Sequence, residues 1–180
     1  AIDTANALAN CLASHYSAEN VELININDLR TSKQTIKFTK MQSTGNDFII
    51  IDTREQFINN PGGLAVRLCN RRSGIGADSL VLVGKTEKAD ASMKFFNLDG
   101  SEGKMAGNAI RAVAKYLYDN NINGIADKHD KNDTTVSISI KTASGIKMLT
   151  AYKLNGKVSS VMVDMGKPSF TAETLPTTLK

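Results

Sequence analysis

The sequence predicts an α+β fold in which several short strands surround one mostly apolar helix. Residues 106–120 contain apolar side chains at the i, i+3, i+4 and i+7 spacing of a helix that packs into a core. These side chains are Ile110, Val113, Ala114 and Leu117. Residues 135–165 alternate apolar and polar side chains in three segments, which is the pattern of an antiparallel meander.

Residues 1–35 form an N-terminal extension with a pattern of its own. Leu8, Leu12 and Tyr16 recur every four residues and predict a short helix that ends near residue 16. Residues 21–26 then alternate like a short strand. We find no chemical motif in this extension and treat residues 36–170 as a separate domain.

Residues 36–104 predict four short strands and one helix. The strands are expected at residues 36–41, 48–51, 80–83 and 92–97. The helix follows the break at residues 59–63, and its apolar face consists of Leu64, Ala65, Leu68 and Cys69. Because Cys69 lies on that face, we interpret it as a packed thiol rather than a catalytic one. Residues 98–104 are expected to form a polar turn.

The last part of the domain predicts one loop and three strands. Residues 121–133 are rich in Asn, Asp, Lys and Gly and are expected to form an exposed loop. The strands are expected at residues 135–141, 146–154 and 157–165, with turns at residues 143–145 and 155–156. Asn155-Gly156 between alternating segments is a strong hairpin signal.

Composition and charge exclude several classes of protein. The 180 residues carry a net charge of +4, but their basic residues are scattered among acids, so we expect no nucleic-acid partner. No apolar run approaches the ~20 residues of a membrane-spanning helix, and no signal-peptide pattern is present. Two cysteines, Cys11 and Cys69, make no disulfide framework and fit a reducing cytoplasm. No cluster of residues predicts a metal site.

Three ordered segments resemble the diaminopimelate epimerase family. They are residues 40–48 (KMQSTGNDF), 68–78 (LCNRRSGIGAD) and 96–111 (FNLDGSEGKMAGNAIR). Residues 163–168 (VDMGKP) are also similar to the strand that closes the first domain of that family. The resemblance covers about residues 36–170, which is most of the chain, and it leaves residues 1–35 unexplained.

The resemblance implies a fold of two similar halves, in each of which a curved, mixed or antiparallel sheet wraps around a central helix. The site would lie in the cleft between the halves. This chain resembles the N-terminal half, with its central helix at about residues 106–120. We therefore expect residues 171–180 to be a linker towards a C-terminal domain of about a hundred further residues.

The implied reaction is the conversion of LL- to meso-diaminopimelate, a step in the synthesis of lysine and peptidoglycan precursors in the bacterial cytoplasm. It is implied to need no pyridoxal phosphate, metal or other cofactor. Two thiols on opposite faces of the α-carbon would remove and return a proton. A thiol suits this role because a helix N-terminus lowers its pKa.

The resemblance places a half-site at the start of the predicted helix. Ala106 occupies the position of the first catalytic cysteine of the family, and Asn46, Asn97, Gly107 and Asn108 match substrate contacts. Gly107 and Asn108 open the helix, where backbone N–H groups and the helix dipole attract a carboxylate. The nearby acidic residues, Asp47, Asp78, Asp99 and Glu102, are expected to hold turns rather than to transfer protons.

Ala106 leaves more than one interpretation open, because a methyl group cannot carry a proton. Ala112 is a second position where the resemblance implies a cysteine. The alanines fit either a deliberate removal of reactive thiols or drift in a copy without catalysis. The chain is then an epimerase half that is inactive alone, a non-catalytic amino-acid-binding or interaction module, or a racemase of another amino acid. An exposed apolar cleft face would favour a homodimer.

Overall fold

The computed structural model describes residues 35–128 and 133–167. The expected helix up to residue 16, the expected strand at residues 21–26 and the expected linker at residues 171–180 lie outside the described residues.

The described residues form one mixed eight-stranded sheet in the order β1-β2-β3-β4-β6-β7-β8, with the short β5 paired to β4. The strands are β1 (Thr39–Ser43), β2 (Asn46–Asp52), β3 (Ser79–Gly84), β4 (Ala91–Phe96), β5 (Glu102–Gly103), β6 (Thr135–Thr142), β7 (Gly145–Leu154) and β8 (Lys157–Val163). The β2–β3 and β4–β6 pairs are parallel, and the other neighbours are antiparallel. The expected α+β class is confirmed.

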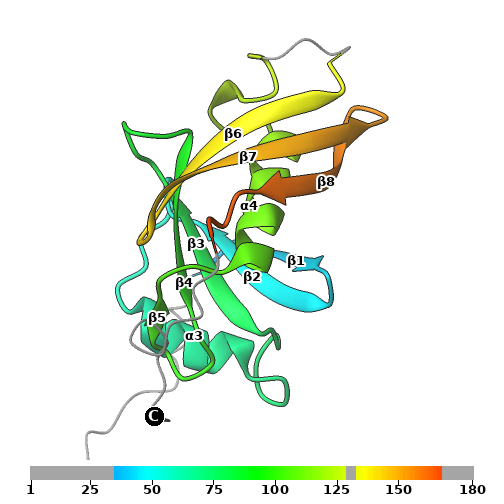
Figure 1. Ribbon diagram of the computed structural model, residues 1–180. Helices are drawn as coiled ribbons and strands as arrows, with labels where there is room; N and C mark the ends of the chain where they lie inside the picture. Colours follow the sequence, from blue (N-terminus) through cyan, green and yellow to red (C-terminus); the bar gives the residue numbers. More distant parts are fainter. Residues whose placement is uncertain (1–34, 129–132, 168–180) are drawn as a thin grey trace, which may run out of the picture. The chain divides into compact units, whose positions relative to one another are not determined.

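Helix α4 (Gly107–Asp119) is the centre of the main core. Figure 1 shows it between two arms of the sheet, with β1 and β2 on one side and β6, β7 and β8 on the other. Its predicted apolar stripe, from Ile110 to Leu117, is fully buried. The sheet therefore curls around α4, as the resemblance implied, and leaves the N-terminus of the helix at one end of this core.

Helix α3 (Pro61–Cys69) belongs to a second, smaller core. Asn60 caps it by accepting a hydrogen bond from the Gly63 N–H at 2.9 Å, and Pro61 occupies the first helical turn. Ala65 and Cys69 are buried, and they pack in one cluster with Leu80 and Phe96 of the sheet. The predicted apolar face of this helix is confirmed.

The antiparallel meander follows the predicted turns. Asn155 and Gly156 have φ values of +52° and +75°, which is the left-handed pair that a two-residue hairpin between twisted strands requires. β7 and β8 pair from Leu154 and Lys157 onwards, with one register shift between Tyr152 and Lys153. The last strand ends at Val163, two residues before the predicted limit.

Three expectations need correction. The first strand begins at Thr39 rather than residue 36, because the Lys37 backbone exchanges hydrogen bonds with the Gln56 side chain instead of a neighbouring strand. The turn at residues 98–104 contains β5. The predicted exposed loop at residues 121–133 is wrong in its first part, where a 3-10 turn (Ile122–Gly124) is followed by Ile125, which is only 2% exposed. The polar composition of residues 121–133 predicted a loop, and it hid the apolar side chain of Ile125, which packs into the core.

Candidate functional site

A pocket of about 420 Å³ lies at the N-terminus of α4. It contains all five residues that the sequence predicts for the site, although they come from three separate segments of the chain. The lining residues are Asn46, Phe48, Asp78, Ser79, Phe95, Asn97, Met105, Ala106, Gly107 and Asn108. β2, β4 and α4 thus meet at one concave surface.

Ala106 is the N-cap residue of α4, with φ −136° and ψ 106°. It is half-buried, and its side chain makes no capping hydrogen bond. The first N–H groups of a helix have no partner within the helix, and they carry its positive partial charge. The α4 N-terminus is therefore suited to an anion such as a carboxylate, as the sequence predicted from Gly107 and Asn108.

The site asparagines are joined by direct hydrogen bonds. Asn108 Nδ2 donates to Asn46 Oδ1 at 2.6 Å, and Asn46 Nδ2 donates to Asp78 Oδ2 at 3.0 Å. Arg111 donates to Asn108 Oδ1 and, at 3.2 Å, to the Thr44 hydroxyl. Asn97 instead donates to the Ser101 hydroxyl at 3.0 Å. The amides of Asn46 and Asn108 thus belong to one chain of hydrogen bonds, whereas the amide of Asn97 is held by Ser101.

The acidic residues beside the pocket are held in ion pairs. Arg71 contacts Asp47 at 2.6 Å and Asp78 at 2.9 Å, and Lys40 contacts Asp47 at 3.2 Å. Hydrogen bonds from Arg71 hold the pKa of Asp47 well below its usual range. The hydrogen bond from Asn46 lowers the pKa of Asp78. These carboxylates stay ionised and join the start of β2 to the residue before β3, so they are poor proton donors.

Asp99 and Glu102 are also held by contacts within the protein. Asp99 accepts hydrogen bonds from the Ser101 backbone and hydroxyl, which lower its pKa, and Glu102 pairs with Lys94 at 3.6 Å. Asp99 thus holds a turn as expected, whereas Asp47, Asp78 and Glu102 join separate segments through hydrogen bonds and ion pairs.

Neither Cys69 nor Ala112 belongs to this pocket. Cys69 is fully buried against the second core, where burial raises the pKa of its thiol. Ala112 is 3% exposed on the buried side of α4. A thiol at position 112 would therefore be packed, whereas a thiol at position 106 would face the pocket.

Sequence patterns missed part of the site. Phe48 and Phe95 form buried apolar walls of the pocket, and Met105 adds a partly buried one. Arg111 was also missed, although it stands three residues after Asn108, on the same helix face. That spacing is the one signal in the sequence that could have linked the two residues.

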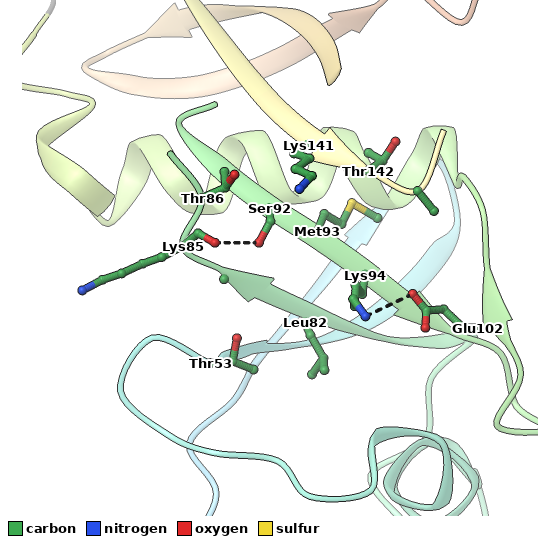
Figure 2. Close-up of a pocket in the computed structure, with 12 residues that line it drawn as sticks. Thr53, Leu82, Lys85, Thr86, Ser92, Met93, Lys94, Glu102, Lys141 and Thr142 are labelled. Carbon is green, nitrogen blue, oxygen red and sulfur yellow. Dashed lines mark hydrogen bonds and ion pairs between the residues drawn. The ribbon is translucent and has the colours of Figure 1, made fainter. Parts of the chain in front are cut away.

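A second pocket, of about 440 Å³, lies on a different part of the sheet. Figure 2 shows the Lys94–Glu102 ion pair and the hydrogen bond from the Ser92 hydroxyl to the Lys85 carbonyl in it. None of the predicted site residues lines this pocket. Its size alone therefore does not make it the candidate site.

The part of the chain that the structure describes contains neither a metal-binding cluster nor a membrane-spanning helix. No group of three or more His, Cys, Asp or Glu side chains there is arranged to hold a metal ion. No helix among the same residues has the length and apolar character needed to cross a membrane.

Solved structures of isomerases share this fold. Methylitaconate-delta-isomerase matches with a TM-score of 0.54 and 14% identity, over 68% of this chain and 36% of its own. A probable proline racemase from Agrobacterium radiobacter K84 matches with a TM-score of 0.50 and 17% identity, over 71% of this chain and 40% of its own. The curled sheet around one helix thus matches part of the fold of each of these isomerases.

The family follows from closer relatives. The model of the family described as diaminopimelate epimerase matches residues 38–171. The diaminopimelate epimerase of Agathobacter rectalis is 43% identical over 78% of this chain and 46% of its own length. The diaminopimelate epimerase of Phocaeicola vulgatus is 48% identical over 74% of this chain and 44% of its own length. The chain belongs to the diaminopimelate epimerase family, and it spans less than half the length of these relatives.

Proposed function

We propose that this chain provides the N-terminal half-site of a diaminopimelate epimerase, which holds one amino-acid end of LL-diaminopimelate. The observation that carries the proposal is the convergence of Asn46, Asn97, Ala106, Gly107 and Asn108 in one pocket. In this proposal the α-carboxylate lies at the N-terminus of α4, beside the amides of Asn46 and Asn108. Cofactor chemistry is not part of the proposed reaction.

The proposed chemistry is inversion by proton transfer. The α-proton of an amino acid is a very weak acid, so hydrogen-bond donors at the carboxylate must stabilise the negative charge that develops when it leaves. One group takes the proton from one face of the α-carbon, and a second group on the other face returns a proton. The electron pair of the broken C–H bond forms the new one, so only the configuration changes.

Ala106 lies where the first of these two groups is required. Its methyl group can neither accept nor donate a proton, so this chain is expected to bind substrate without exchanging the α-proton. The second group and the other wall of the site are proposed to come from a C-terminal half like that of the longer relatives. The proposed setting is lysine and peptidoglycan precursor synthesis in the cytoplasm.

A solvent-exchange assay tests this proposal. The Ala106→Cys variant, mixed with the separately expressed C-terminal half of the Agathobacter rectalis relative, is expected to incorporate deuterium from D2O at the α-carbon of LL-diaminopimelate. The original chain in the same mixture is expected to incorporate none. Ala112→Cys is the matched control. It adds a thiol to the same helix, but on the side that is buried in the protein core and outside the pocket.

The other outcomes separate the remaining interpretations. Exchange by the original chain would contradict the inactive half-site. Binding of LL-diaminopimelate without exchange in the Ala106→Cys mixture would favour an amino-acid-binding module. Exchange with proline but not with LL-diaminopimelate would favour a racemase of another amino acid.

A further inference from the structure

Four side chains beside the candidate site form one directed hydrogen-bond chain. It runs from Arg111 to Asn108, then to Asn46, and ends at Asp78. Asn108, Asn46 and Asp78 line the pocket, and the two amides come from α4 and β2, 62 residues apart in sequence. The chain therefore links the first turn of the helix to the start of a strand.

The two ends of the chain determine its direction. A guanidinium has only donors, so the Asn108 atom that contacts Arg111 is the amide oxygen. An ionised carboxylate has only acceptors, so the Asn46 atom that contacts Asp78 is the amide nitrogen. The contact between the two amides can then have one polarity alone, with Asn108 as the donor and Asn46 as the acceptor.

We infer that Arg111 and Asp78 are positioning residues that fix the amide orientation of Asn108 and Asn46, so that both present N–H donors to the ligand. Each amide oxygen already accepts a hydrogen bond within the chain, while each amide nitrogen retains a second N–H. The remaining N–H of each amide can therefore donate to a carboxylate. This extends the donor set of the α4 N-terminus by two N–H groups.

Asp78 is itself held in place, as a positioning residue requires. Its Oδ1 accepts from Arg71 at 2.9 Å, and its Oδ2 also accepts from the Asp47 backbone N–H at 3.2 Å. The Arg111 guanidinium is tied to the β1–β2 turn through the Thr44 hydroxyl. Both ends are thus anchored to residues outside the amide pair.

The test replaces Asp78 by asparagine, which can donate as well as accept and so removes the constraint on direction. The side-chain 1H–15N signals of Asn46 and Asn108 are expected to shift or broaden in Asp78→Asn. They are expected to stay unchanged in Asp78→Glu, which keeps an acceptor-only group. Asp127→Asn is the matched control, because Asp127 accepts from the Asn121 amide at 2.7 Å, away from the pocket.

Binding of LL-diaminopimelate gives an independent readout with an informative sign. If Asp78 acted only through its negative charge, its removal would strengthen binding of a carboxylate. Loss of the amide orientation is instead expected to weaken binding by about tenfold, since one hydrogen bond to a charged group is lost.

Unchanged amide signals in Asp78→Asn, or tighter binding of LL-diaminopimelate, would overturn the inference. If Asp78→Asn fails to fold, Arg111→Met tests the other end of the chain by the same signals, with Arg72→Gln as the control. The ligand in this inference rests on the proposed function. If the signals change as expected but the original chain binds no LL-diaminopimelate, the orientation stands and the proposed function fails.

Discussion

At the residue scale, position 106 combines a helix N-cap with a pocket wall. Because the Ala106 side chain makes no capping hydrogen bond, the first N–H groups of α4 remain available to a ligand in the pocket. A thiol introduced by Ala106→Cys is expected to have a pKa below its usual value of about 8.5, since a helix N-terminus favours the thiolate. The pH dependence of alkylation by iodoacetamide, followed by mass spectrometry, measures it.

Two thiols serve as references for that measurement. Cys69 is buried, and burial raises its pKa, so it should react slowly in the same sample. Ala112→Cys places a thiol in the middle of α4, on its buried side and away from the helix N-terminus. An introduced thiol at position 106 that reacts no faster than these two would contradict the favourable electrostatics of the site.

Gly107 and Gly103 are expected to differ in how much an added methyl group destabilises the fold. A Cβ at Gly107 would meet nothing closer than the Met165 sulfur at 3.5 Å, so Gly107→Ala is expected to change the free energy of unfolding by less than about 1 kcal/mol. A Cβ at Gly103 would lie 2.0 Å from the Phe95 ring, so Gly103→Ala is expected to destabilise the fold by about 1–3 kcal/mol. Urea unfolding measures both.

Ligand binding completes the comparison of the two glycines. Because a Cβ at Gly107 would make only ordinary van der Waals contact with Met165, we attribute the glycine to close approach of a ligand rather than to packing. Gly107→Ala is therefore expected to weaken LL-diaminopimelate binding while the fold is retained. Unchanged binding in Gly107→Ala would contradict this assignment.

At the element scale, sequence patterns predicted the elements that local periodicity defines. α4 follows from its apolar stripe, α3 from Asn60-Pro61, and the last hairpin from Asn155-Gly156. They missed what depends on distant contacts. β5 exists because it pairs with β4, and the amide chain exists because Asn108 meets Asn46 across 62 residues. Neither contact has a signature in the neighbouring residues.

Ile125 gives a test of the loop that was expected to be exposed. It packs in the main core with α4 residues and strand residues of β6. Ile125→Ala is therefore expected to lower the free energy of unfolding by about 2–5 kcal/mol, through lost burial and a cavity. Ile122→Ala, at a partly buried position of the same segment, should cost less. Equal small effects at both positions, measured by urea unfolding, would show that this segment contributes little to the core.

At the scale of the whole molecule, the ion pairs beside the site connect its stability to pH. The folded pKa values of Asp47 and Asp78 are depressed, by Arg71 and by Asn46 respectively. Their contribution is therefore present above the unfolded pKa of about 3.9 and is lost as pH falls through the folded values. Urea unfolding at pH 7, 5 and 3 is expected to show falling stability towards pH 3.

Arg71→Gln is the variant that isolates this network. It removes the partner shared by Asp47 and Asp78, so the acid-dependent loss of stability is expected to shrink. Arg72→Gln removes a neighbouring exposed cation that makes no ion pair with the described residues, and it should keep the original pH dependence. The same pH dependence in both variants would exclude Arg71 as its source.

Self-association is the remaining whole-molecule property, and half of the large exposed apolar side chains among the described residues lie on two neighbouring strands. Five large ones lie on β7 and β8: Ile146, Met148, Tyr152, Leu154 and Met162. We propose that this sheet face supports a homodimer, since two copies can meet there through apolar contact and without burying a carboxylate. Sedimentation velocity is expected to show a dimer that Met148→Gln weakens. Val66→Gln, at a similarly exposed apolar position on α3, should leave it intact, and a concentration-independent monomer in the original chain would contradict the proposal.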